Sequence, residues 1–103
     1  KAANSKALQA AYTNAAQAYL STSQWDKVVE RCDKCLAVNP ENLKALFRRG
    51  CACSAVRNWE AARANLQKVL ELDGDNAATE NSIASSAKNE LTAVEEKILE
   101  LKA

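Results

Sequence analysis

The sequence repeats itself at an offset of 34 residues. Trp25 aligns with Trp59, Leu36 aligns with Leu70, and Asp26 aligns with Glu60. The segment 39–42 also aligns with 73–76, because Asn-Pro-Glu-Asn matches Asp-Gly-Asp-Asn. A fixed period of this length is the signature of a solenoid, in which each unit buries its apolar face against its neighbour. The period therefore predicts a stack of similar units.

Each period contains two stretches with apolar residues at helical spacing. In the first period these are Leu8, Ala11, Tyr12, Ala15 and Tyr19, followed by Trp25, Val28, Val29, Cys32 and Leu36. Only two Gly and one Pro interrupt the chain, and Ala, Leu, Lys, Glu and Gln favour helix. We predict an all-α fold with helices over 4–21, 24–37, 40–55, 59–71 and 75–101, and no sheet.

Polar residues that favour helix ends mark the boundaries of these helices. We expect Ser23 and Asp26 to form an approximate capping box at the second helix. We expect Asn39 to cap the third helix, which would start at Pro40. Asn58 should cap the fourth helix, and Asp73 and Gly74 should close it.

The last helix has apolar residues on one face, which we expect to cover the second repeat at least over the first half of the helix. These are Ile83, Ala87, Leu91, Val94, Ile98 and Leu101. We therefore divide the chain into an N-terminal lead-in (1–8), two repeats (9–42 and 43–76) and a C-terminal amphipathic capping helix (77–103). Because the chain starts at Lys1 in the middle of a helical pattern, we expect a fragment of a longer protein.

Charge and hydropathy exclude two classes of partner. Fourteen basic and thirteen acidic residues give a net charge of +1, which lacks the basic excess of a nucleic-acid-binding domain. The sequence also lacks the run of roughly 18 apolar residues that spans a membrane, and its N-terminus has no signal-peptide pattern. We expect a soluble, cytoplasmic protein, with the nucleus as a second intracellular compartment.

The four cysteines allow a zinc interpretation, which we consider weaker than a structural one. Cys32, Cys35 and Cys53 occupy positions that favour small packing residues, and Cys51 and Cys53 point in different directions on a helix. The chain has no His to activate a cysteine nucleophile. We therefore expect no metal, no cofactor, no stable disulfide and no enzymatic activity in this chain.

The repeats resemble tetratricopeptide repeats (TPRs), whose large, small and aromatic positions are matched in both periods. The residues at the family's positions are Tyr12, Ala15, Ala16, Tyr19, Val28, Cys32, Cys35 and Pro40, and then Leu46, Arg49, Gly50, Cys53, Ala62, Leu66, Val69 and Gly74. Cys35, Arg49 and Gly74 depart from the family pattern. The resemblance implies two TPR helical hairpins, made of four antiparallel helices, and a capping helix.

Residues 39–50 and 58–70 resemble more closely the TPR domain of the large immunophilins, the FK506-binding-protein and cyclophilin type of prolyl isomerase. This resemblance covers roughly residues 8–100 and extends to related co-chaperones. It implies a protein-protein interaction module of a co-chaperone. An isomerase domain would lie elsewhere in the parent protein.

The same resemblance implies a binding site called a carboxylate clamp, which holds the acidic C-terminal tail of heat shock protein 90, ending in Glu-Glu-Val-Asp. At the family's clamp positions this chain has Asn14, Lys44 and Arg48. The Lys and Asn that the family takes from a preceding repeat have no counterpart here, so we expect a partial clamp. Lys6 is able to approach the groove, but it lies off the matching position and receives no role.

Structural alternatives remain for these residues. Lys44 and Arg48 also fit a solvated basic helix face, and the tryptophans fit packing at the hairpin turns better than ligand stacking. For Arg49 we expect a structural contact. The alternative function is a scaffold segment that packs with other repeats, or that self-associates through an exposed N-terminal helix face, without binding a carboxylate tail.

Overall fold

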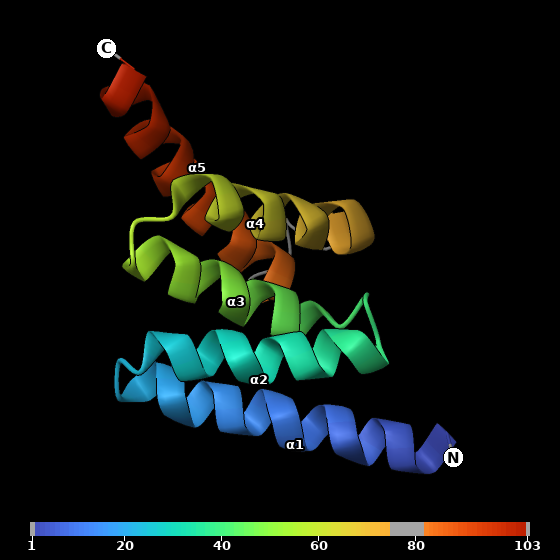
Figure 1. The fold of residues 1–103 in the computed structure, drawn as a ribbon. Helices are drawn as coiled ribbons and strands as arrows, with labels where there is room; N and C mark the ends of the chain where they lie inside the picture. The colour runs from blue at the N-terminus through green and yellow to red at the C-terminus, as the bar shows by residue number, and fades with distance from the viewer. Residues whose placement is uncertain (1, 75–81, 103) are drawn as a thin grey trace.

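The computed structural model describes residues 2–74 and 82–102, which form five α-helices within these ranges. They are α1 (Ala2–Ser21), α2 (Trp25–Val38), α3 (Leu43–Ala55), α4 (Trp59–Asp73) and α5 (Ile83–Lys102). Figure 1 shows α1 to α4 stacked in chain order with alternating directions, and α5 crossing behind α3 and α4. The predicted all-α solenoid with a C-terminal capping helix is confirmed.

The core consists of two clusters that follow the repeats. The first lies between α1, α2 and α3, and is made of Ala16, Val28, Cys32, Cys35, Ala45 and Ala52. The second lies between α3, α4 and α5, and is made of Leu46, Cys53, Ala62, Leu66, Val69, Ala87, Leu91, Val94 and Ile98. Leu36 packs against both clusters. At Gly50 a Cβ atom would lie 3.0 Å from Cγ of Leu66, so glycine permits the close approach of α3 and α4.

The start of α3 differs from the prediction. Asn42, not Asn39, caps the helix, because its Oδ1 accepts a hydrogen bond from the backbone N–H of Ala45 at 2.9 Å. Asn39 instead closes α2, where its backbone N–H donates to the carbonyl of Cys35. The side chain of Asn39 accepts a hydrogen bond from the N–H of Glu41 at 3.1 Å, which closes a turn between the two helices. Pro40 therefore lies in the connecting turn and α3 begins at Leu43.

The turns within the two hairpins share one backbone conformation. Ser23 has a φ of 60° and Arg57 has a φ of 65°, and these residues lie one repeat apart. The predicted capping box of Ser23 and Asp26 is wrong, because Ser23 adopts this left-handed conformation. Gln24 occupies the N-cap position of α2 and makes no side-chain capping bond. The predicted cap of α4 is confirmed, since Asn58 Oδ1 accepts a hydrogen bond from the N–H of Ala61.

The capping helix α5 begins at Ile83, where Ser82 Oγ accepts a hydrogen bond from the N–H of Ser85 at 2.9 Å. The prediction of one uninterrupted helix over 75–101 is therefore wrong at Ser82, and its residues 75–81 lie outside the described ranges. Gly74 follows α4 in a right-handed conformation. The repeat boundaries at 9–42 and 43–76 stay a prediction.

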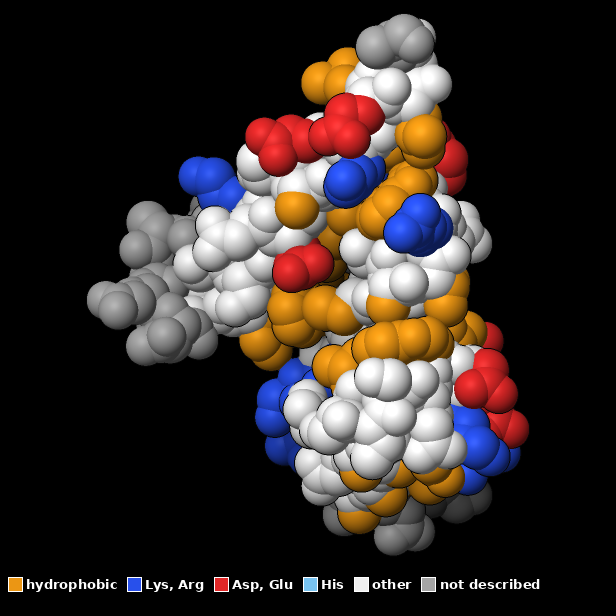
Figure 2. All heavy atoms as spheres, turned by 90° about the vertical axis from the view of Figure 1, so that its left-hand side faces the viewer, with side chains coloured by type: hydrophobic (Ala, Val, Ile, Leu, Met, Phe, Trp, Pro, Cys, Tyr) orange, Lys and Arg blue, Asp and Glu red, His pale blue; other side chains and the backbone are white. Residues whose placement is uncertain are grey.

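The inner face of α5 covers the second repeat, while its last turns extend past α4 (Figure 1). Leu101, which continues the apolar spacing into the last turn of α5, is 72% exposed, and Leu99 is 69% exposed. Figure 2 shows hydrophobic side chains along this part of the molecule, over α4 and α5. A hollow of about 300 Å³ lies here between the start of α4 and the end of α5, next to Trp59.

Candidate functional site

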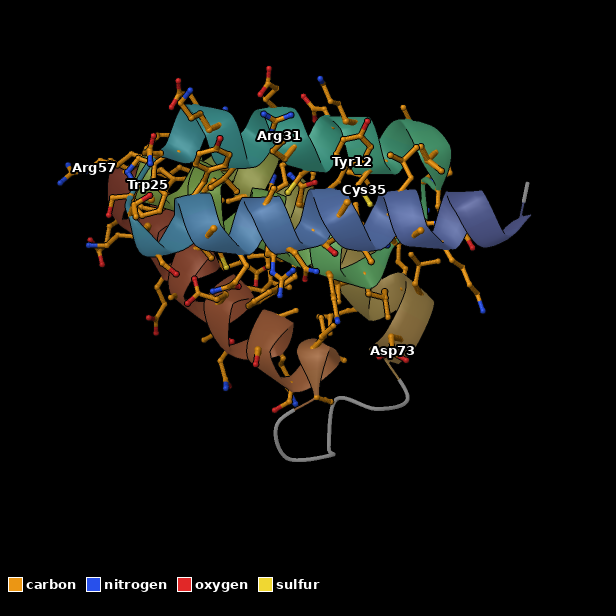
Figure 3. All side chains as sticks on the ribbon, turned by 90° about the horizontal axis from the view of Figure 1, so that it is seen from below. Tyr12, Trp25, Arg31, Cys35, Arg57 and Asp73 are labelled. Carbon is orange, nitrogen blue, oxygen red and sulfur yellow. The ribbon has the colours of Figure 1, made fainter. Side chains whose placement is uncertain are left out.

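A hollow of about 480 Å³ lies where α1, the α2–α3 turn, the start of α3 and the start of α5 meet. Seen from below in Figure 3, α2 lies to one side of α1 and α5 lies to the other. The hollow is lined by Lys6, Gln9, Ala10, Thr13, Asn14, Asn39, Glu41, Asn42, Leu43, Lys44 and Ile83. Most of these residues carry polar side chains, and the apolar side chains of Ala10, Leu43 and Ile83 complete the wall.

Two of the predicted site residues, Asn14 and Lys44, line this hollow. Asn14 lies on α1 next to Thr13, which is only 3% exposed. Lys44 lies in the first turn of α3, two residues after the Asn42 cap. Both side chains are exposed, and neither has a hydrogen-bond or ion-pair partner within residues 2–74 and 82–102. Their donor groups are thus available to a ligand.

The third predicted residue, Arg48, lies one turn further along α3 and does not line the hollow. Its Nη1 donates a hydrogen bond of 2.8 Å to the main-chain carbonyl of Thr13, which joins α3 to α1. Burial lowers the pKa of Arg48. The structure therefore brings Asn14 and Lys44 together and places Arg48 beside them, in contact with the same helix that carries Asn14.

A network of amide side chains fixes the floor of the hollow. Gln9 Oε1 accepts hydrogen bonds from Asn39 Nδ2 at 2.9 Å and from Asn42 Nδ2 at 3.0 Å. Gln9 Nε2 donates to Ser5 Oγ at 3.1 Å. These bonds tie α1 to the turn from which Lys44 follows. This role of Gln9 was not predicted, because no local pattern pairs a residue on the first helix with caps thirty or more positions later.

Lys6, to which the sequence analysis gave no role, lines the same hollow. The side chain is exposed and lies on α1, on the same wall as Ala10 and Asn14. The spacing of Lys6 from Ala10 and Asn14 could have indicated this position, since residues one turn apart on a helix lie on one face. Alignment of the two repeats could not assign a role to Lys6, because this residue precedes the first full repeat.

The cysteines are mainly packing residues. Cys32 and Cys35 are fully buried and Cys53 is 8% exposed. Burial raises the pKa of both Cys32 and Cys51 to about 12, so these thiols stay protonated at neutral pH and are poor nucleophiles and poor metal ligands. Cys35 Sγ donates to the carbonyl of Gln9. Within the described ranges, no three His, Cys, Asp or Glu side chains are arranged to hold a metal ion.

Arg49 makes the structural contact expected of it. Its Nη1 lies 2.7 Å from Oδ1 of Asp33 on α2, and its Nε donates to Oδ1 of Asn65 on α4 at 2.9 Å. Asn65 is 7% exposed, and its Nδ2 donates to the carbonyl of Ala61 at 2.8 Å. Arg49 thus departs from the small residue of the TPR pattern and joins the two repeats.

The tryptophans also have structural contacts. Trp25 packs against the first core cluster and Trp59 packs against the second, and both are half-buried. Figure 3 shows Trp25 at the end of the stack where α1 turns into α2. Tyr19, from the first repeat, has Lys27 Nζ and Arg31 Cζ over its ring, at 5.7 Å and 5.9 Å from the centroid. These contacts favour packing at the hairpin turns over ligand stacking.

Several curated proteins share part of this sequence. The chain is 40% identical over 75 residues to peptidyl-prolyl cis-trans isomerase FKBP4 from Homo sapiens, a match that covers 73% of the chain and 16% of that protein. It is 39% identical over 72 residues to human FK506-binding protein-like, with 70% and 21% covered. Mouse sperm-associated antigen 1 is 34% identical over 74 residues, with 72% and 8% covered. The chain thus spans a small part of these relatives. No family model matches it.

Two solved structures share the fold. The Hsp90 co-chaperone Cns1 from Saccharomyces cerevisiae matches 95% of this chain and 29% of its own, with a TM-score of 0.79 and 25% identity. The Arabidopsis OM64 TPR domain matches 82% of this chain and 66% of its own, with a TM-score of 0.69 and 26% identity.

The matched region is the TPR part of these proteins and not a catalytic domain. Among the described residues, no helix is long and apolar enough to cross a membrane. The helical hairpins, the repeat positions and these relatives agree, and the chain is a tetratricopeptide repeat domain of the immunophilin co-chaperone type.

Proposed function

We propose that this domain binds the acidic C-terminal tail of heat shock protein 90 in the hollow between α1, α3 and α5. Asn14, Lys44 and Arg48 form a partial carboxylate clamp. The observation that carries the proposal is that Asn14 and Lys44 come from different repeats, yet line one hollow with unpaired donor groups. The similarity to a protein described as an Hsp90 co-chaperone supports the choice of partner.

The chemistry of the hollow suits a C-terminal aspartate, which carries two carboxylates. The Lys44 ammonium donates to one carboxylate, and the Asn14 amide donates a neutral hydrogen bond. The guanidinium of Arg48 has five N–H donors, of which Thr13 uses one, so it still has donors for a side-chain carboxylate of the tail. Charge-assisted hydrogen bonds contribute about 1.5 to 3 kcal/mol each before losses to solvent, which is consistent with roughly micromolar affinity.

Calorimetric titration with the peptide Met-Glu-Glu-Val-Asp tests this function. Lys44→Ala should weaken binding about tenfold or more, because an ammonium donor to a carboxylate is lost. Arg48→Ala should weaken binding by a similar factor. Raising the salt concentration should weaken the wild type and should have less effect on either variant.

Lys34→Ala is the matched control, because Lys34 is exposed on α2 and does not line the hollow. It should bind almost as the wild type does. Arg48→Ala also removes the hydrogen bond to the carbonyl of Thr13. The melting temperature of this variant is therefore measured in parallel. Binding that is indifferent to the Lys44 and Arg48 substitutions, or no binding to the wild type, would contradict the clamp.

The second candidate function is self-association through the outer face of α1. This face carries exposed Ala11 and Ala18, and Leu8 at 42% exposure. The equivalent residues of the second repeat, Ala45 and Ala52, are fully buried. Association should raise the mass in sedimentation velocity with concentration, and Ala18→Glu should abolish the rise. A constant monomer mass at millimolar concentration contradicts self-association.

For the parent protein we propose a cytoplasmic location, where the chaperone tail is available.

A further inference from the structure

Two features of Lys6 make its charge available to a ligand in the hollow. It is the single charged residue in α1, whose other residues are Ala, Leu, Tyr, Asn, Gln, Ser and Thr. It also has no ion-pair or hydrogen-bond partner in residues 2–74 and 82–102, although it lines the hollow. No carboxylate on its own helix competes for its ammonium group. Its charge is therefore available to a ligand in the hollow.

The position of Lys6 relative to Lys44 is set by contacts on both sides of the hollow. Gln9, less than one turn after Lys6, is bonded to Asn39 and Asn42 in the turn before α3. Further along α1, the carbonyl of Thr13 accepts the bond from Arg48. These bonds hold the α1 wall against the α3 wall, so two ammonium groups from different helices share one hollow.

We infer that Lys6 is an affinity-determining residue of the hollow, where it acts with Lys44 to select ligands that carry two anionic groups. The inference rests on the proposed function and adds a residue that the repeat pattern does not supply. Lys44 binds one carboxylate of an acidic C-terminal peptide, and Lys6 binds a second from the opposite wall. A ligand with one carboxylate engages one ammonium group and leaves the other solvated.

Glu41 sets a limit on the strength of this selection. It lines the same hollow, it is exposed, and its backbone N–H donates to Asn39 Oδ1 at 3.1 Å, which holds it in the turn. Its carboxylate repels an acidic ligand and competes for the two ammonium groups. Removing this charge should therefore strengthen binding, whereas removing the charge of Lys6 should weaken it.

The test uses titration of the whole chain with Met-Glu-Glu-Val-Asp and with the same peptide carrying a C-terminal amide, at low salt. Lys6→Ala should weaken binding of the free acid about three- to fivefold, the range expected for an exposed ion pair. Lys6→Arg should restore most of the affinity, because it keeps the charge. Glu41→Gln should strengthen binding about two- to threefold.

The amide peptide identifies the partner of Lys6. If one of the two lysines binds the terminal carboxylate, the amide peptide leaves substitution of that lysine with almost no further effect and substitution of the other with its full effect. Equal and reduced effects of both substitutions would show that the two lysines share the terminal carboxylate, and would overturn the assignment of one carboxylate to each lysine. Lys34→Ala is again the charge-matched control, and an effect of Lys6→Ala no larger than that of Lys34→Ala would overturn the role of Lys6.

These outcomes separate the inference from the proposed function. Loss of binding in Lys44→Ala with unchanged binding in Lys6→Ala overturns the role of Lys6 and leaves the clamp in place. A wild-type chain that binds neither peptide overturns both. Loss in both single variants, with rescue by Lys6→Arg, supports both. Circular dichroism of each variant confirms that the helices are retained, which is expected because Lys6 and Glu41 are exposed.

Discussion

The two repeats have matching positions but different surroundings. In the second repeat, Ala45 and Ala52 are fully buried, because α2 covers them. Their equivalents in the first repeat, Ala11 and Ala18, are exposed. The second repeat also packs against α5, so its cluster includes four residues of that helix. Burial at a repeat position is therefore determined by the neighbouring unit as much as by the residue itself, as expected for a solenoid.

The largest difference in stability between equivalent substitutions in the two repeats is expected at the centres of the two core clusters. Leu66 and Cys32 occupy equivalent positions and both are fully buried. Leu66→Ala should reduce the free energy of unfolding by about 2 to 5 kcal/mol, because it leaves a cavity between α3, α4 and α5. Cys32→Ala removes one sulfur atom and should cost about 1 kcal/mol. Urea denaturation measures the free energy of unfolding of both variants. Equal losses in the two variants would contradict the expected difference between the two clusters.

A smaller loss of stability is expected when Arg49 is replaced by Ala, the residue type of its equivalent in the first repeat, Ala15. Arg49→Ala removes the bonds to Asp33 and Asn65, and leaves the nearly buried Oδ1 of Asn65 without its donor. The expected loss is about 1 to 2 kcal/mol, since the Asp33 pair is partly exposed and contributes little. Asp33→Asn should cost less than half as much. A larger effect of Asp33→Asn would assign the stabilisation to the ion pair instead of the Asn65 bond.

The N-caps of α2 and α4 offer a further comparison at equivalent positions. Asn58 caps α4 with its side chain, whereas Gln24 makes no such bond at α2. Asn58→Ala should lower the free energy of unfolding by about 1 kcal/mol, and Gln24→Asn should raise it by about 0.5 kcal/mol. Thermal unfolding of the two single variants measures these shifts. A loss of stability in Gln24→Asn would indicate that the backbone at residue 24 does not permit a cap.

The smallest effect should be the same in both repeats. Ser23 and Arg57 adopt a left-handed conformation that glycine tolerates without strain. Ser23→Gly and Arg57→Gly should each stabilise the protein by about 0.5 kcal/mol, because relief of strain exceeds the added entropy of the unfolded chain. Differential scanning calorimetry can resolve the increase when both changes are combined. A decrease in either variant would indicate that the turn is held by its side chain.

The repeat period predicted much of the fold because helical spacing and inter-repeat packing follow from local sequence. It predicted the helices, the cap at Asn58 and the inner stripe of α5. It did not distinguish Asn39 from Asn42 as the cap of α3, since both have the same preference and the choice depends on where α2 ends. It also placed a capping box at Ser23, because the pattern does not encode the left-handed turn.

The candidate site was less accessible to sequence analysis. Asn14 and Lys44 could be named from the resemblance to the immunophilin TPR domain, and both line one hollow in the structure. The bond between Arg48 and the carbonyl of Thr13 could not be predicted, because it joins two helices through a main-chain atom. The contact of Gln9 with Asn39 and Asn42 depends in the same way on how α1 packs against a distant turn.

The packing of Leu36 against both core clusters has a consequence for unfolding. In a linear array, stability is the sum of the stability of each unit and the coupling between neighbours. Leu36 contributes to that coupling, because its side chain is part of both units. Replacing it with Ala should weaken the cooperativity of unfolding more than the stability of either repeat. We expect the wild type to unfold in a single transition and the Leu36→Ala variant in two, with the first repeat melting before the one that α5 covers.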